Sequence, residues 1–129
     1  MKNYREYYKQ LGNLLYAVAS ADGNISKKEL QELRKMVSEK LVPAELHNDD
    51  FGSDAAFSVE FQFDFLEGND YTADMAFEEV AEYLKHNAAL LPQKDKDLMM
   101  EGARKVAEAF HHINKEEMSF LNKLAGLLQ

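Results

Sequence analysis

Four oxygen-bearing side chains lie close together near the start of the sequence, in the stretch ADGNISKKE: Asp22, Asn24, Ser26 and Glu29. Hard cations such as calcium prefer several oxygen ligands on a flexible loop. The spacing is not that of an EF-hand, because with Asp22 as the first position the glycine position holds Lys27 and the final glutamate position holds Leu33. One interpretation is a small site for a divalent cation (calcium, magnesium or manganese), with Asp22, Asn24 and Glu29 as its ligands.

Helix punctuation explains the same residues without a cation. An Asp-Gly pair such as Asp22-Gly23 is typical of the turn that ends a helix. Ser26 stands three residues before Glu29, which is the spacing of a capping box: the hydroxyl and the carboxylate each accept a hydrogen bond from an otherwise unpaired backbone amide. Such a cap stabilises a helix by about 0.5–2 kcal/mol, which accounts for the glutamate by itself. Both interpretations remain open at this point.

His111 and His112 are the second candidate for metal chemistry. Adjacent residues point in different directions, and the sequence has no H-x-x-x-H or H-E-x-x-H spacing. A solvated turn is one interpretation, and a metal-dependent hydrolase that uses these rings beside carboxylates is the alternative. Nucleophile elbows, phosphate-binding loops and Ser/His/Asp groupings do not occur, so we predict no catalytic residue.

The composition limits the partners of the chain. It has 129 residues, no cysteine and a formal net charge of −8. Disulfides and zinc–thiolate sites are therefore excluded, and an acidic surface repels nucleic acids, so cations or basic protein surfaces are the expected partners. The N-terminal segment lacks the apolar core of a signal peptide, and no apolar run approaches the ~18 residues of a membrane span. We expect a soluble, cytoplasmic protein whose oligomeric state the sequence leaves open.

Apolar residues recur at three- and four-residue steps along most of the chain, which predicts amphipathic helices. The expected helices cover residues 4–20, 26–41, 55–67, 73–84, 94–110 and 115–128. Gly68 is expected to end the third of these helices, and Thr72 is expected to cap the fourth. We therefore predict a single all-α domain over residues 1–129, a compact bundle of six to seven helices.

The segment 55–67 is the hardest to assign. Its aromatic residues alternate with polar ones, which is a strand period, but a strand without a partner is unstable. On a helix the same segment has two apolar stripes, Phe57/Phe61/Phe65 and Val59/Phe63/Leu66, and we expect it to be buried on two sides, with a hairpin as the alternative. Residues 47–54 before it are expected to form an acidic loop, in which Asp49, Asp50 and Asp54 are either solvated or fold over the Asp22 turn.

The two ends of the chain resemble each other at an offset of 88 residues. This similarity predicts two related helical hairpins, about 4–40 and 94–128, around a central helical insert. Asp22-Gly23 is not repeated, since its counterparts are Phe110 and His111, so the hairpin itself does not require the aspartate. The identical pairs are Val18/Val106, Ala19/Ala107, Ala21/Ala109, Ile25/Ile113, Lys27/Lys115, Glu29/Glu117, Leu33/Leu121 and Lys35/Lys123.

The stretch LLYAVASADGNISKKELQELRKMV resembles the signature of the TerB-like family, which is named for a tellurite-resistance protein. The resemblance rests on an alanine-rich helix, an Ala-Asp-Gly turn, a small apolar residue, a cap and a glutamate, found here as Ala19, Ala21, Asp22, Gly23, Ile25, Ser26 and Glu29. It returns more weakly over residues 104–128. The second hairpin departs from an acidic turn, and residues 55–67 have no counterpart in the family pattern.

The resemblance implies an all-helical fold with near-symmetric hairpins and no enzymatic activity. It further implies a divalent cation at the acidic turn, with Asp22 and Glu29 as the positions carried over. We therefore expect a binding or scaffold module with a protein partner, associated with a stress response. The alternatives are the hydrolase using His111 and His112, and a purely structural oligomerisation domain.

Overall fold

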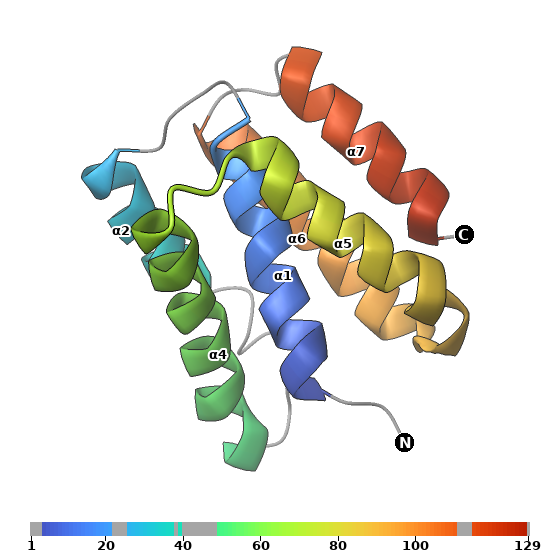
Figure 1. Ribbon diagram of the computed structural model, residues 1–129. Helices are drawn as coiled ribbons and strands as arrows, with labels where there is room; N and C mark the ends of the chain where they lie inside the picture. Colours follow the sequence, from blue (N-terminus) through green and yellow to red (C-terminus); the bar gives the residue numbers. More distant parts are fainter. Residues whose placement is uncertain (1–3, 22–25, 38, 40–48, 111–114, 129) are drawn as a thin grey trace.

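The computed structural model describes residues 4–21, 26–37, 39, 49–110 and 115–128. Within these ranges every regular element is a helix, which confirms the all-α prediction (Figure 1). The elements are α1 (Tyr4–Ala19), α2 (Lys27–Met36), α4 (Asp49–Gly68), α5 (Ala73–Asn87), the 3-10 helix η2 (Ala88–Leu90), α6 (Gln93–Phe110) and α7 (Lys115–Leu128).

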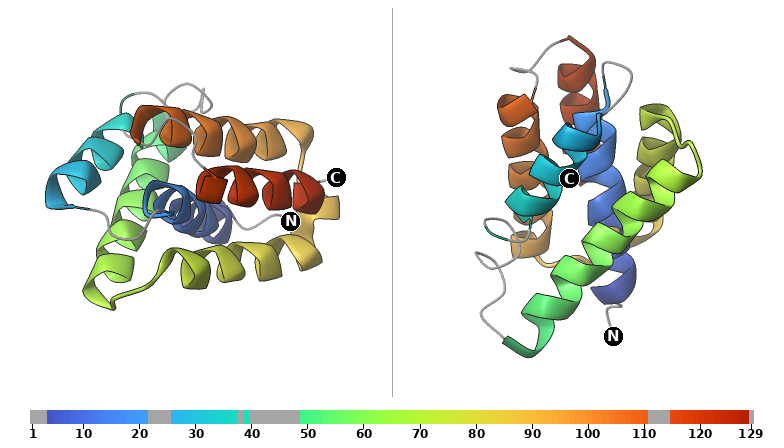
Figure 2. Two further views of the ribbon diagram at one scale, coloured as in Figure 1. Left: turned by 90° about the horizontal axis from the view of Figure 1, so that it is seen from above. Right: turned by 90° about the vertical axis from the view of Figure 1, so that its left-hand side faces the viewer.

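Helix α1 lies at the centre of the bundle. It packs against α4, α5 and α6, and Figure 2 shows these helices arranged around it. Its residues from Leu11 to Ala19 are all buried, as expected for a helix that is apolar on most sides. Helix α7 completes the bundle by packing against α5 and α6.

The predicted helix caps are present. The Ser26 hydroxyl accepts a hydrogen bond from the Glu29 amide at 3.1 Å, and Oε1 of Glu29 accepts one from the Ser26 amide at 2.9 Å. At the start of α5, Oγ1 of Thr72 accepts a hydrogen bond from the Met75 amide at 3.1 Å. These local bonds satisfy amides that have no partner inside the helix, so they fix where α2 and α5 begin.

Helix α4 confirms the helical interpretation of residues 55–67 but corrects its burial. One stripe, Val59/Phe63/Leu66, is fully buried. In the other stripe Phe61 is 61 % exposed and Phe65 is 42 % exposed, so the expectation of burial on two sides was wrong. Helix α1 covers one side of α4, while the side that carries Phe61 and Phe65 is open to solvent.

Both ends of α4 add detail to the predictions. The helix begins at Asp49, so Asp49, Asp50 and Asp54 belong to it and the acidic loop expected over residues 47–54 was wrong there. Carboxylates in a first helical turn are favoured by the helix dipole, which the loop prediction neglected.

The helix ends at Gly68 as expected. The residue whose backbone adopts the left-handed conformation after the helix is Asp70, with φ 53°. The Tyr71 amide then donates to the Leu66 carbonyl at 3.0 Å, a typical helix-end bond.

The predicted hairpins correspond to α1–α2 and α6–α7, and their first helices pack together. The Tyr7 hydroxyl donates a buried hydrogen bond of 2.6 Å to the carbonyl oxygen of Asp95, which is its counterpart at the offset of 88 residues. The inner faces agree position by position, since Leu11/Met99, Leu15/Ala103 and Val18/Val106 are all buried. The second helices have different neighbours: α7 packs against α5 and α6, whereas Arg34 of α2 forms an ion pair with Asp64 of α4.

Helices α1 and α4 approach each other closely at Gly12. A β-carbon placed there would lie 3.0 Å from the β-carbon of Gln62 and 3.2 Å from the carbonyl oxygen of Val59. Neither atom is the flexible end of a side chain, so a larger residue must push the two helices apart. By contrast, a β-carbon at Gly126 of α7 would have nothing within 4 Å.

We therefore expect the same substitution to have opposite effects at the two glycines. Gly12→Ala lowers the free energy of unfolding by about 1–3 kcal/mol through overpacking. Gly126→Ala raises it by about 0.5–1 kcal/mol, because alanine loses less backbone entropy in a helix. Urea unfolding followed by circular dichroism measures both changes. A stabilising Gly12→Ala would contradict the close approach of α1 and α4.

Candidate binding groove

The structure describes only part of the predicted cation site. Glu29 lies in the first turn of α2, where its carboxylate accepts the Ser26 amide hydrogen bond described above. Asp22 and Asn24 lie outside the described residues, as do His111 and His112. In the part of the chain that is described, no group of three or more histidine, aspartate or glutamate residues could hold a metal ion. The cation site and the histidine site therefore remain predictions.

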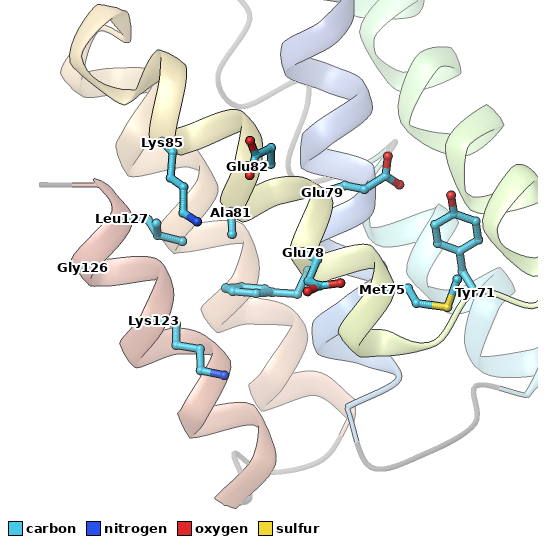
Figure 3. Close-up of a pocket in the computed structure, with 11 residues that line it drawn as sticks. Tyr71, Met75, Glu78, Glu79, Ala81, Glu82, Lys85, Lys123, Gly126 and Leu127 are labelled. Atoms are coloured by element: carbon cyan, nitrogen blue, oxygen red, sulfur yellow. The ribbon is translucent and has the colours of Figure 1, made fainter.

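An open groove runs along the surface between α5 and α7, with a volume of about 900 Å³ (Figure 3). The two helices run in the same direction and pack against each other beneath it (Figure 1). Phe77 of α5 lines the groove, and its ring stacks on the ring of Phe120 from α7, with centroids 4.9 Å apart. Ala81 and Leu127 add further apolar surface at the groove. The base is thus apolar and supported by the core.

Charged side chains are unevenly distributed along the groove. Helix α5 contributes Glu78, Glu79 and Glu82, followed by Lys85 near the C-terminal end of the helix, and α7 contributes Lys123. Glu78 and Glu82 are exposed, and the Glu82 carboxylate lies 3.1 Å from Nε2 of His86. Figure 3 shows Lys85 and Lys123 pointing toward the space between α5 and α7, whereas Glu79 and Glu82 lie on the side of α5 away from α7, so the carboxylates form no single acidic wall of the groove.

One end of the groove continues into an exposed apolar surface. Tyr71 and Met75 line that end, and Met75 is 44 % exposed. The Tyr71 ring lies 5.6 Å from the ring of Phe65, which is partly exposed on α4. Apolar surface therefore extends from the exposed stripe of α4 into the groove, and exposed apolar surface of this kind is typical of interaction sites.

Sequence reasoning did not find this groove. The spacing of apolar residues on α5 predicts an inner face of Ala76, Phe77, Val80, Ala81, Tyr83 and Leu84; Ala81 and Tyr83 are half-buried and the other four are buried. Met75 lies outside the inner face of α5 and is exposed. An apolar residue at such a position is the feature of the sequence that points to a second apolar surface on this helix. The groove itself depends on the separation of α5 and α7, which no local pattern encodes.

Two tyrosines have perturbed ionisation. Burial raises the pKa of Tyr16, and the carboxylates of Glu67 and Asp70 raise it further. Burial likewise raises the pKa of Tyr83, assisted by Glu6 and Asp95. The folded state therefore favours the neutral phenol at both positions.

This shift predicts a loss of stability at alkaline pH. Unfolded tyrosine ionises near pH ~10, so above that pH the unfolded chain binds fewer protons than the folded one. The stabilisation is complete below pH ~10 and is lost as the pH rises through the folded-state pKa values. We expect the Tyr16→Phe/Tyr83→Phe variant to lose stability less steeply than the wild type in urea titrations between pH ~8 and ~11. Parallel slopes for the two proteins would contradict this assignment.

The described helices form an all-α bundle with an open groove on its surface. A family model described as "Tellurite resistance protein TerB" matches residues 9–129. The chain therefore belongs to the TerB family, as the Ala-Asp-Gly turn and its flanking helices indicated. Neither the curated proteins nor the solved structures gave a match. Among the helices of the described ranges, none is long and apolar enough to cross a membrane.

Proposed function

We propose that this TerB-family chain is a binding module that acts by protein contact rather than by catalysis, in a stress response. The observation that carries the proposal is the groove between α5 and α7. Phe77, which lines the groove, is stacked on Phe120 of α7, and the open side of the groove gives a partner access to apolar surface. Rigid apolar grooves between helices are a common way to bind a segment of another protein.

Site-specific photo-crosslinking in the cells that make the protein tests this proposal. A photoreactive phenylalanine analogue at Met75, in the groove, is compared with the same analogue at Leu90, which is 75 % exposed and does not line the groove. We expect a discrete protein adduct from position 75 and none from position 90. The substitution Gly126→Leu fills open space in the groove and should remove the adduct without changing the helical signal. An adduct that survives in the folded Gly126→Leu protein would overturn the proposal.

A divalent cation at the Asp22 turn is the second part of the proposal. Glu29 lies in the first turn of α2, and Asp22 and Asn24 precede it in the sequence by seven and five residues. Carboxylate and amide oxygens suit calcium, magnesium or manganese. Bound there, the cation would supply positive charge that orders the turn, and the role of the three residues would be to hold it.

Calorimetric titration of the purified protein with each of the three cations tests this part. We expect binding heat for the wild type and a weaker signal for Asp22→Asn, which keeps the size of the side chain and removes its charge. Asp74→Asn, an exposed aspartate in the first turn of α5, serves as the control. Absence of heat with every cation, together with identical melting of wild type and Asp22→Asn, would end the cation proposal.

A further inference from the structure

We infer that the outer side of α5, together with the corner where α4 meets α5, binds a basic segment of a different protein. An apolar side chain of that segment packs on the corner, and its lysine or arginine residues pair with carboxylates along α5. The carboxylates in question lie on the side of α5 away from α7, so this surface is distinct from the groove of the proposed function (Figure 3).

The corner between α4 and α5 supplies the apolar anchor site. Phe65, in the last turn of α4, is 42 % exposed, and its ring lies 5.6 Å from the ring of Tyr71 in the link between the two helices. Met75, near the start of α5, is 44 % exposed and lines the same end of the groove as Tyr71. Apolar side chains from two helices and their link therefore remain in contact with water at one place, which is typical of an interaction site.

The outer side of α5 continues from Met75 as a stripe of carboxylates. Glu78, Glu79 and Glu82 follow Met75 by three, four and seven residues, a spacing that places all four on one side of the helix. Glu78 and Glu82 are exposed, and Glu79 is half-buried. Lys85 does not interrupt the stripe, because it points toward the space between α5 and α7 (Figure 3). An apolar anchor site thus leads directly into an acidic stripe.

The charge of the surrounding chain selects a basic occupant. Residues 41–84 contain more than half of the 23 aspartate and glutamate residues and none of the 15 lysine and arginine residues. In the part of this segment that the structure describes, Arg34 of α2 forms an ion pair with Asp64, and the exposed imidazole of His86 lies 3.1 Å from the Glu82 carboxylate. The field on this side of the molecule is therefore negative and attracts lysine and arginine side chains.

A second copy of the chain is a poor match for this surface. The basic residues of α2 and α6 are interspersed with carboxylates one turn away, as in Lys28 with Glu32 and Arg104 with Glu108. Within the described residues, neither of these helices exposes a large apolar side chain. A partner that combines an apolar anchor with an uninterrupted basic stripe is therefore expected to be a different protein.

Binding of two fluorescent peptides to the purified full chain tests the inference. One peptide has a pair of leucines followed by a run of lysines, and the other has glutamine in place of every lysine. We expect the lysine peptide to bind at least about tenfold more tightly at low salt, with a difference that shrinks as the ionic strength rises. Equal affinity for the two peptides would overturn the inference. A dimer in light scattering that the lysine peptide dissociates would assign the surface to a second copy and would overturn it as well.

Charge variants locate the basic part of the peptide. Glu79→Gln/Glu82→Gln should weaken binding of the lysine peptide about threefold to tenfold, as expected for the loss of two ion pairs at the surface. Glu101→Gln/Glu108→Gln makes the same change in net charge on exposed residues of α6 and should alter the affinity less than about twofold. Equal losses in the two variants would show that net charge alone is responsible and would overturn the inference.

A pair of methionine variants locates the apolar part. Met75→Gln should weaken both peptides about threefold to tenfold, because the leucines lose apolar surface at the corner. Met118→Gln makes the same change at a methionine of α7 that is 46 % exposed and lies outside the corner, and it should leave both affinities unchanged. Equal effects of the two substitutions would contradict an anchor site at the corner and overturn the inference.

The Gly126→Leu variant separates this surface from the groove of the proposed function. Gly126 lines the groove, so the lysine peptide should bind the folded variant as tightly as it binds the wild type. Loss of peptide binding in this variant would place the peptide in the groove and overturn the inference while the groove stands. If instead the crosslinked adduct at position 75 survives in Gly126→Leu and the α5 charge variant weakens the peptide, the groove fails and the outer side of α5 remains the binding surface.

Discussion

Replacing Phe63 by alanine is expected to lower the free energy of unfolding by about 3–5 kcal/mol, a large share of the about 5–15 kcal/mol of a typical domain. The same replacement at Phe61, two residues earlier on the same helix, should change it by no more than about 0.5 kcal/mol. Phe63 is completely buried, whereas Phe61 is 61 % exposed. Removing the Phe63 ring leaves a cavity in the core, whereas most of the Phe61 side chain is already in water.

This pair of substitutions also tests how α4 is folded. On a strand Phe61 and Phe63 would share a face and respond alike, because side chains at i and i+2 point the same way. On a helix they lie about 200° apart, which allows opposite environments. Urea unfolding curves for the two variants, analysed with a common slope, give both free energies. Similar losses at the two positions would contradict the burial pattern of α4.

Replacing Asn13 by leucine is the second substitution with a large expected effect, a loss of about 2–4 kcal/mol. Asn13 is fully buried where α1 meets α4. Its Oδ1 accepts a hydrogen bond from Nε2 of Gln62 at 2.7 Å, and its Nδ2 donates to Oε1 of Gln10 at 2.9 Å. Leucine can form neither bond, so a buried donor and a buried acceptor each lose this partner.

A double-mutant cycle that combines Asn13→Leu with Gln62→Leu measures the interaction free energy between these two side chains, apart from their other contacts. Replacing both amides by apolar groups removes the unpaired Gln62 donor as well, so the double variant should lose less than the sum of the single losses, by about 0.5–3 kcal/mol. Asn122→Leu, at an exposed asparagine of α7, is the control and should change stability by no more than about 0.5 kcal/mol. Strictly additive losses at Asn13 and Gln62 would contradict the hydrogen bond between them.

Much of the fold was accessible from the sequence because the decisive interactions are local. The spacing of apolar residues predicted the last helix over residues 115–128, and α7 spans Lys115–Leu128. The caps at Ser26 and Thr72 form between residues three apart, so their signature is visible in the sequence itself. The family was recognisable for the same reason, since its turn and flanking helices form one continuous stretch.

The errors and omissions concern contacts between distant parts of the chain. Periodicity showed two apolar stripes on α4, but whether each stripe meets a neighbour depends on where other helices pack. Gly12 and Gln62 are 50 residues apart, and their close approach exists only in the folded bundle. The groove likewise exists only because α5 packs against α7, which also brings Phe77 and Phe120 together.

The sequence by itself determined the helices, their caps, the repeated hairpins and the family, because each of these is specified by side chains within a few turns of one another. Only the tertiary structure decided which aromatic residues are buried and where a partner finds apolar surface. The physical reason is that burial removes a side chain from water only when a second element covers it, and helix periodicity specifies a face but not what covers it.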